Sequence, residues 1–243
     1  MSKFHGRNVR VYIDGFDISG YTNSLSVEQT ADIVDVACFG DSNKNYVVGL
    51  FDSKVMHDGF FEDTPTTGGN AVLAPRLGSA VQFMACIGTQ QGAFGFAGSA
   101  ELERTYDINS SITDAVKRKV ELDNSGTQGI DNVTMLLSRA QQSGTGPSFN
   151  SGTFSNAGGR FYMQNFGTFG VATPITASGS MRVIGGTDAA MSTAGTVLLA
   201  DFGAIGSAGG SAQGISYSGT MPQFIQVDCY SGTPNVAVAF VRI

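Results

Sequence analysis

Apolar and polar residues alternate with a period of two along most of this chain. Residues 8–15 read NVRVYIDG, which places three aliphatic side chains on one face of an extended strand. The same alternation recurs in residues 24–29, 115–122 and 235–243. Such alternation predicts half-buried β-strands. Short turns rich in Gly, Ser and Asn separate these segments, so the pattern predicts an all-β sandwich or barrel.

One segment departs from this pattern. Residues 66–79 read TTGGNAVLAPRLGS, with Asn70 as a candidate N-cap ahead of an apolar run. We expect a short helix over Ala71–Leu77, interrupted or kinked near Pro75 because proline lacks the backbone N–H that a helix uses. The expected fold is therefore all-β with one short helix that closes one edge or end of the first sandwich.

Charge divides the chain into two parts. Residues 1–140 hold 11 Lys and Arg against 17 Asp and Glu, whereas residues 141–243 hold three of each. We predict a first β domain over residues 1–140, a Gly- and Ser-rich linker over residues 141–159, and a second, smaller β-sandwich over residues 160–243. Five strands are expected in the second domain, and the glycine-rich residues 203–214 are expected to form a flexible loop between two of them.

Residues suited to catalysis or metal binding are scarce. His5 and His57 have no second His or Cys at ligand spacing, which disfavours zinc, and His57 is expected to be a half-exposed strand residue. Asp14 and Asp17 flank a predicted turn, but no oxygen-rich calcium loop follows them. No nucleophile or phosphate-binding motif is present. We expect no enzymatic activity, no cofactor and no metal.

Cysteine usage and charge indicate the compartment and exclude one class of partner. Cys38, Cys86 and Cys229 are far apart in sequence and form no CxxC pair, which is typical of free thiols in a reducing cytoplasm. No segment has the sustained apolar character of a membrane span. The net charge of −6 disfavours a surface that grips nucleic acid. The tight basic cluster at residues 117–119 is interpreted as a solvated strand face.

An acidic stretch runs through the first domain. Between Arg10 and Lys44 there are six carboxylates and no Lys or Arg. They are interpreted either as a solvated acidic edge or as a surface that repels DNA phosphates. Four of them are candidates for such a surface: Glu28, Asp32, Asp35 and Asp41.

A loop between two strand-like segments carries more apolar surface than a solvated loop requires. Residues 38–50 read CFGDSNKNYVVGL. In a lone monomer these aromatic and aliphatic side chains would remain in water, whereas a neighbouring copy could cover them. The residues predicted to make this inter-subunit contact are Phe39, Gly40, Asp41, Tyr46, Val47, Gly49 and Leu50.

The order of these motifs resembles that of phage major tail proteins, the tail tube subunits of long-tailed phages. The resemblance includes IDGFDISGY at residues 13–21, DIVDV at 32–36, FGD at 39–41, YVVGL at 46–50 and GFF at 59–61. It continues through AELERTYDI and VKRKVEL to LLADFG and the terminal VAVAFVR, and so covers most of the chain. A Thr pair is commoner than Ala37-Cys38 before the Phe-Gly, and here the chain departs from the pattern.

The resemblance implies a fold and an assembly. Tail tube subunits are β-sandwiches or barrels with a flanking helix that close into rings, usually hexameric, and the rings stack. Inner strands would line a channel through which DNA passes without specific binding, and the acidic candidates would face it. The chain would act in the tail of the virion beside other phage tail proteins, after assembly in the cytoplasm of the host bacterium.

The sequence also allows other roles. The C-terminal domain would decorate the outside of the tube, or alternatively make weak contact with cell-surface glycans. The whole chain could instead be a capsid decoration or tail terminator protein, which would form trimers or single rings without stacking. A carbohydrate-binding module is a third class, which the absence of tryptophan disfavours.

Overall fold

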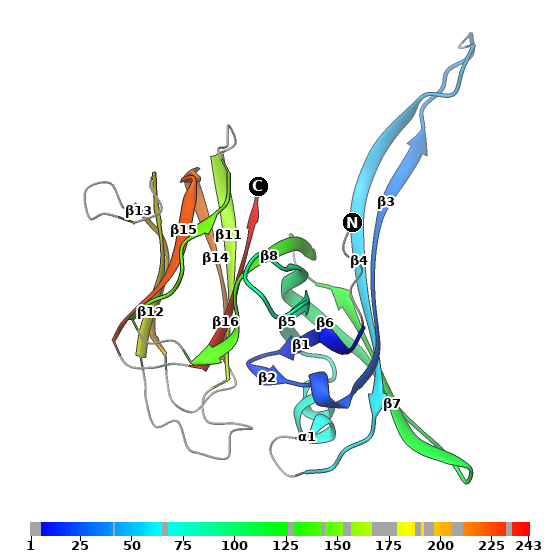
Figure 1. The fold of residues 1–243 in the computed structure, drawn as a ribbon. Coiled ribbons are helices and arrows are strands. Elements are labelled where there is room, and N and C mark those ends of the chain that lie inside the picture. The colour runs from blue at the N-terminus through cyan, green and yellow to red at the C-terminus, as the bar shows by residue number, and fades with distance from the viewer. Residues whose placement is uncertain are drawn as a thin grey trace.

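The computed structural model is an all-β fold, as the sequence predicts. It describes residues 6–40, 42–64, 68–125, 129–141, 144–152, 157–166, 179–187, 191, 197–205, 211–231 and 235–243. In this part of the chain the strands form one sheet of eleven and one of five, with a single short α-helix (Figure 1). None of the described helices is long and apolar enough to cross a membrane.

The elements of the first half are η1 (Gly6–Asn8), β1 (Val9–Ile13), β2 (Phe16–Asp17), η2 (Ser19–Tyr21), β3 (Thr22–Asp35), β4 (Tyr46–Phe60), α1 (Gly69–Leu73), η3 (Ala74–Arg76), β5 (Ala80–Ile87), β6 (Phe94–Ser111), β7 (Asp114–Asn124) and β8 (Asp131–Gln141). Those of the second half are β9 (Gly144–Thr145), β10 (Phe149–Asn150), β11 (Ala157–Asn165), β12 (Gly179–Gly186), β13 (Val197–Ile205), β14 (Ser211–Thr220), β15 (Phe224–Ser231) and β16 (Asn235–Arg242).

The large sheet is continuous through both halves of the chain. Its main path runs in the order β14-β11-β16-β8-β6-β5-β1-β2. A branch at β6 continues through β7 and β4 to β3, so that β3, β4, β7 and β6 form a four-stranded antiparallel unit. Strand β8 pairs with β6 on one side and β16 on the other, and thereby joins the two halves.

The second half is a sandwich in which the five-stranded sheet packs on part of the large one. Strand β16 shows how its core is built, because both of its faces are buried. Val236, Val238 and Phe240 enter the core between the two sheets, whereas Ala237 and Ala239 face a different cluster. The predicted placement of alternate residues on opposite faces is confirmed, but the strand is buried on both faces and not half-buried.

That different cluster belongs to both halves of the chain. Tyr12, Met84 and Met135 come from the first half, and Tyr162 and Phe166 from the second. The rings of Tyr12 and Phe166 meet edge to face with their centroids 4.9 Å apart. The cluster therefore packs the two halves together in the way that an ordinary protein core is packed.

Buried amides add directional contacts at the same place. The Gln82 side-chain nitrogen donates to the carbonyl oxygens of Met163 at 3.3 Å and Gln213 at 3.1 Å. In return, the Gln164 side-chain nitrogen donates to the Gln82 carbonyl oxygen at 3.1 Å. Each bond joins residues more than 80 positions apart, so the register between the halves is set by hydrogen bonds as well as by apolar packing.

The short helix is present, but its start differs from the expectation. Helix α1 begins at Gly69, and the residue at the N-cap position is Gly68. Asn70 lies inside the helix, where its side-chain oxygen accepts a hydrogen bond from the Tyr106 hydroxyl at 2.8 Å. Val72 is buried in the first-half core. The α-helix ends at Leu73 and the 3-10 turn η3 follows over Ala74–Arg76, which confirms the predicted interruption near Pro75.

Two segments expected to lack strands contain them. Residues 141–159, predicted as the linker, include β9 and β10, which both pair with β15, and the first residues of β11. The glycine-rich segment 203–214 includes the end of β13 and the start of β14, while residues 206–210 lie outside the described residues. The division into domains at residues 140 and 159 stays a prediction.

We expect the two halves to unfold together. Met135→Ala should lower the free energy of unfolding by about 2 to 5 kcal/mol, because it empties space in the shared cluster. Circular dichroism and tyrosine fluorescence during urea unfolding should give one common transition in both the parent and the variant. Two separate transitions in the parent protein would contradict the shared core.

Candidate functional site

The β3–β4 hairpin extends well beyond the body of the protein. The two strands pair from Thr22 opposite Gly59 out to Asp35 opposite Tyr46, and the Val36 N–H donates to the Asn45 carbonyl oxygen at 2.8 Å (Figure 1). Strand β7 pairs with β4 only over Lys54–Phe60. The outer part of the hairpin is therefore a two-stranded ribbon, which is marginally stable in water by itself.

Large apolar side chains on this ribbon are exposed. Phe39 at the tip has a relative exposure of 112%, and Leu50 and Phe51 have exposures of 80% and 76%. The other exposed large apolar residues of the hairpin are Ile33, Val34, Val36, Tyr46, Val47 and Val48. A contiguous apolar surface of this kind is typical of an interaction site.

The predicted contact residues fall in two kinds of structure. Phe39 and Gly40 form part of the tip, whereas Tyr46, Val47, Gly49 and Leu50 belong to strand β4. Asp41 lies outside the described residues. The residues predicted for the contact did not include the partner strand, whose Ile33 and Val34 lie opposite Val48 and Val47. The apolar residues Ile33, Val34 and Val36 of TADIVDVA could have indicated that this strand takes part.

The acidic candidates lie along one strand and do not form a compact cluster. Glu28, Asp32 and Asp35 all belong to β3, and Glu28 is separated from Asp35 by about 23 Å of extended chain. Glu28 pairs in register with Lys54, and the Asp35 carboxylate lies 3.9 Å from the Lys44 ammonium. The fourth candidate, Asp41, cannot be placed with them because it is not among the described residues.

A network of ion pairs covers the outward face of the four-stranded unit. The Glu121 carboxylate lies 3.0 Å from Lys54, 2.7 Å from Arg104 and 2.8 Å from Lys119. Lys119, Arg104 and Lys54 together hold the pKa of Glu121 at about 2. Arg104 also contacts Asp123 at 3.0 Å. Sequence reasoning missed this network, since the register of three strands decides which charges meet.

The basic cluster at residues 117–119 is not wholly a solvated face. Lys117 and Lys119 are exposed, but Arg118 is buried because successive side chains of a strand point to opposite faces. Its guanidinium lies where a Cβ at Gly69 would be, directly against α1. In the described part of the chain the guanidinium nitrogens have no hydrogen-bond partner, and burial lowers the pKa of Arg118.

The histidine expected to be half-exposed is buried. The His57 Nε2 atom lies 2.7 Å from the Thr22 hydroxyl, and burial together with nearby Arg118 lowers the pKa of His57 to about 3. The imidazole is therefore neutral at physiological pH. His5 lies outside the described residues.

The two aspartates of the first turn are each paired with an arginine. Asp14 contacts Arg76 at 2.8 Å, and Asp17 contacts Arg139 at 2.8 Å. Asp14 and Gly15 both adopt positive φ angles, of 48° and 78°, as a two-residue hairpin turn requires. Within the described ranges, no group of three or more His, Cys, Asp or Glu side chains is arranged to hold a metal ion.

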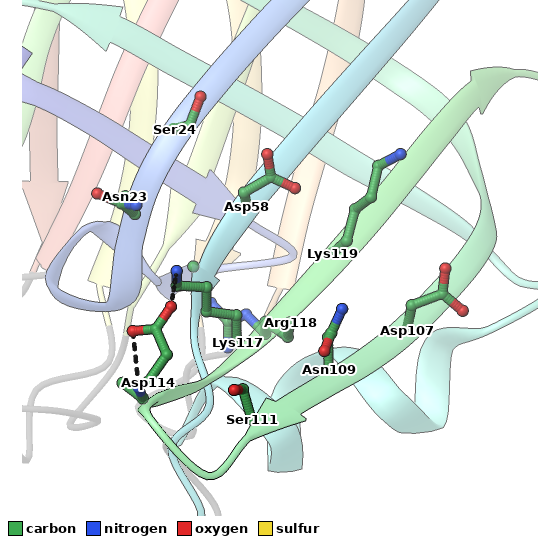
Figure 2. Close-up of a pocket in the computed structure, with 12 residues that line it drawn as sticks. Asn23, Ser24, Asp58, Asp107, Asn109, Ser111, Asp114, Lys117, Arg118 and Lys119 are labelled. Atoms are coloured by element: carbon green, nitrogen blue, oxygen red, sulfur yellow. Dashed lines mark hydrogen bonds and ion pairs between the residues drawn. The ribbon is translucent and has the colours of Figure 1, made fainter.

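Figure 2 shows an open, polar cavity of about 410 Å³ near the turn between β6 and β7. Asp58, Asp107 and Lys119 line it from three adjacent strands, and Asp114 forms an ion pair with Lys117 at its edge. Its acidic and basic groups alternate, so it offers no single sign of charge to a ligand.

The three cysteines differ in their exposure. Cys86 and Cys229 are buried, and Cys38 is exposed beside Phe39 at the tip of the β3–β4 hairpin. Burial raises the pKa of Cys86 to about 11, so this thiol is unreactive.

Comparison with known proteins gives distant structural neighbours. No family model matches the sequence, and no curated protein matches it. A chain in the virion of the native gene transfer agent particle covers 54% of this chain and 98% of its own, at 13% identity and a TM-score of 0.41. A chain in the tail of the empty gene transfer agent particle, refined with C6 symmetry, covers 54% and 98%, at 14% identity and a TM-score of 0.39.

A third neighbour matches over almost the whole chain. The Dit protein of phage SPP1, described as part of a hub adsorption apparatus in phages that infect Gram-positive bacteria, covers 97% of this chain and 99% of its own. The identity is 10% and the TM-score is 0.35. At these levels of similarity the function has to be argued from the residues and geometry of this chain itself.

The buried carboxylate of Glu101 predicts a dependence of stability on pH. Burial, with Asp123 and Asp52 nearby, raises the pKa of Glu101 from its ordinary value of 4.5 to about 7. Between pH 4.5 and about 7, the folded state therefore keeps a proton on Glu101 that the unfolded state has released. The free energy of unfolding consequently falls as the pH rises through this range. Glu101→Gln should reduce that fall and raise the free energy of unfolding at pH 8 by about 1 to 3 kcal/mol.

Urea unfolding at pH 5 and pH 8 measures this effect. The matched control is Glu28→Gln, which changes an exposed carboxylate on strand β3 and should leave the pH dependence unchanged. An equal loss of stability in the parent and in Glu101→Gln would show that Glu101 is not the group responsible.

Proposed function

We propose that this protein is a structural component of a phage tail that assembles with copies of itself into stacked rings, forming the tail tube. The observation that carries the proposal is the β3–β4 ribbon, whose exposed apolar side chains and unpaired strand edges need a partner. The order of sequence motifs, which resembles that of major tail proteins, supports the same assignment.

The edges of the four-stranded unit suggest how copies join side by side. In the described chain β3 pairs only with β4, so its other edge is free. At the opposite side of the unit, β6 beyond Glu103 pairs only with β7. Unpaired edges invite pairing with another chain, and two different edges produce a head-to-tail contact that closes into a ring when the rotation allows.

In a ring, the outward face of the four-stranded unit would point the same way in every copy, relative to the ring axis. The face carries Glu28, Glu121 and Asp123 together with the basic side chains that pair with them. We propose that it lines the channel, because paired charges and free carboxylates offer DNA phosphates no cluster of cations to bind. The chain would then act within the virion tail, beside other tail proteins.

Substitutions at the tip of the ribbon test the proposal. Phe39→Asp and Tyr46→Asp should each leave the monomer folded by circular dichroism, since both side chains are exposed. Both should prevent tubes in negative-stain images, because a carboxylate cannot be desolvated in an apolar contact without a large cost. The matched control is Asn43→Asp, which adds the same charge to an exposed polar position of the tip.

Normal tubes from both Phe39→Asp and Tyr46→Asp would contradict the assembly role of the ribbon. Single rings or trimers of the parent protein, without stacking, would favour a tail terminator or capsid decoration protein instead. Specific glycan binding by a parent protein that stays monomeric would favour a carbohydrate-binding module.

The channel assignment has its own test. Assembled parent protein should retain little duplex DNA at 0.15 M salt, whereas Glu28→Lys should retain more, with binding that weakens as salt rises. Co-sedimentation of labelled DNA with the assemblies measures this. The control is Asp201→Lys, which makes the same charge change at an exposed position of β13. Equal retention of DNA by the two variants would contradict the assignment of this face to the channel.

A further inference from the structure

A second hairpin, β6–β7, projects from the four-stranded unit in the opposite direction to β3–β4. Figure 1 shows the two hairpins leaving the body at opposite ends. Ser111 pairs with Asp114, which leaves Ile112 and Thr113 as the turn. Ile112 has a relative exposure of 105%, and Ile108 and Val116 behind it are exposed as well.

Local turn chemistry does not explain an isoleucine in this position. Two-residue hairpin turns most often contain Asn, Asp or Gly, whereas this turn consists of Ile112 and Thr113. An isoleucine fully in water at the end of a hairpin also contributes nothing to the core of its own copy. Ile112 therefore has the chemistry of an anchor that is buried only when another molecule covers it.

A groove of matching character lies at the base of the β3–β4 ribbon. Its volume is about 860 Å³, and Leu50, Phe51 and Ile130 supply its large apolar side chains. Leu50 and Phe51 are exposed where the ribbon leaves the body, and Asn124 of β7 also lines the groove. Exposed Asp52 lies in the groove as well, whereas the charges beside the tip, Asp114 and Lys117, pair with each other.

A second apolar cavity in the described part of the chain is a poorer match for the tip. It measures about 330 Å³, and Val9, Leu25 and Phe96 along its wall are already partly buried against the first-half core. The polar cavity of Figure 2 lies beside the turn of the β6–β7 hairpin itself and presents polar and charged side chains. Of these three cavities, the groove at Leu50 and Phe51 offers an isoleucine the most exposed large apolar side chains.

We propose that the tip of the β6–β7 hairpin docks into this groove on the next copy of the same chain along the stack. The inference rests on the proposed function, because it requires copies arranged head to tail. Hairpins that leave the body at opposite ends favour such an arrangement: a tip at one end meets a groove near the other, and repetition extends the stack without limit. The contact would be distinct from the edge-to-edge pairing within a ring.

Cysteine cross-linking tests the contact directly. In a Cys38→Ser background, Ile112→Cys protein and Leu50→Cys protein are prepared separately, mixed, assembled and oxidised mildly. A disulfide-linked dimer should form in the mixture and not in either protein alone. Ser218→Cys, on an exposed position of distant β14, replaces Leu50→Cys in the control mixture and should give no dimer.

A dimer that forms in the Ile112→Cys protein alone would indicate tip-to-tip contact and overturn the proposal. Two further results would overturn this inference and leave the proposed function intact. In the first, tubes form normally but Ile112→Cys and Leu50→Cys do not cross-link. In the second, the Ser218→Cys mixture cross-links equally. If the unmodified protein forms no assembly at all, the proposed function and this inference both fail.

Substitution of the tip provides a second measurement. Ile112→Asp should raise the protein concentration at which stacks appear by at least about tenfold, while the monomer remains folded. Thr113→Asp adds the same charge at the neighbouring position and should change that concentration less than about twofold. Equal behaviour of Ile112→Asp and the parent protein would overturn the docking of Ile112.

Discussion

A two-stranded ribbon has no second layer to cover its apolar side chains or its backbone edges. Strands β3 and β4 leave the body as such a ribbon, with Phe39, Leu50 and Phe51 in water. A single copy of the chain has no described element that covers them. Burial against another copy satisfies the side chains and the strand edges together, which is why self-assembly is the function that the geometry supports best.

The body of the protein is built to hold these projections rigidly. Strand β8 links the first-half sheet to the second half, and the cluster around Tyr12, Met135 and Phe166 packs the two halves together. The four-stranded unit carries both hairpins on continuous strands, so their directions are fixed relative to each other. On its outward face, Glu121 draws three cations into one network, which leaves a surface of paired charges beside the free edge of β3.

Much of this architecture follows from the sequence, and the exceptions have physical causes. Period-two alternation predicted the strands, and the apolar character of residues 38–50 pointed to the ribbon. The glycine-rich start of β14 gave no alternation to detect. Arg118 is buried against α1 and His57 beside Thr22, and no local pattern reveals these tertiary contacts. The Glu121 network and the groove beside Leu50 require the register between strands, which tertiary structure alone decides.

The central claim is that a single copy of this chain is incomplete. Sedimentation velocity of the purified protein from micromolar to millimolar concentration tests it most directly, with electron microscopy of the fast-sedimenting fraction. As the concentration rises, we expect the monomer to give way to species of increasing size, which the microscope shows as stacked rings. A single sharp monomer boundary across the whole range, with no larger species, would contradict it.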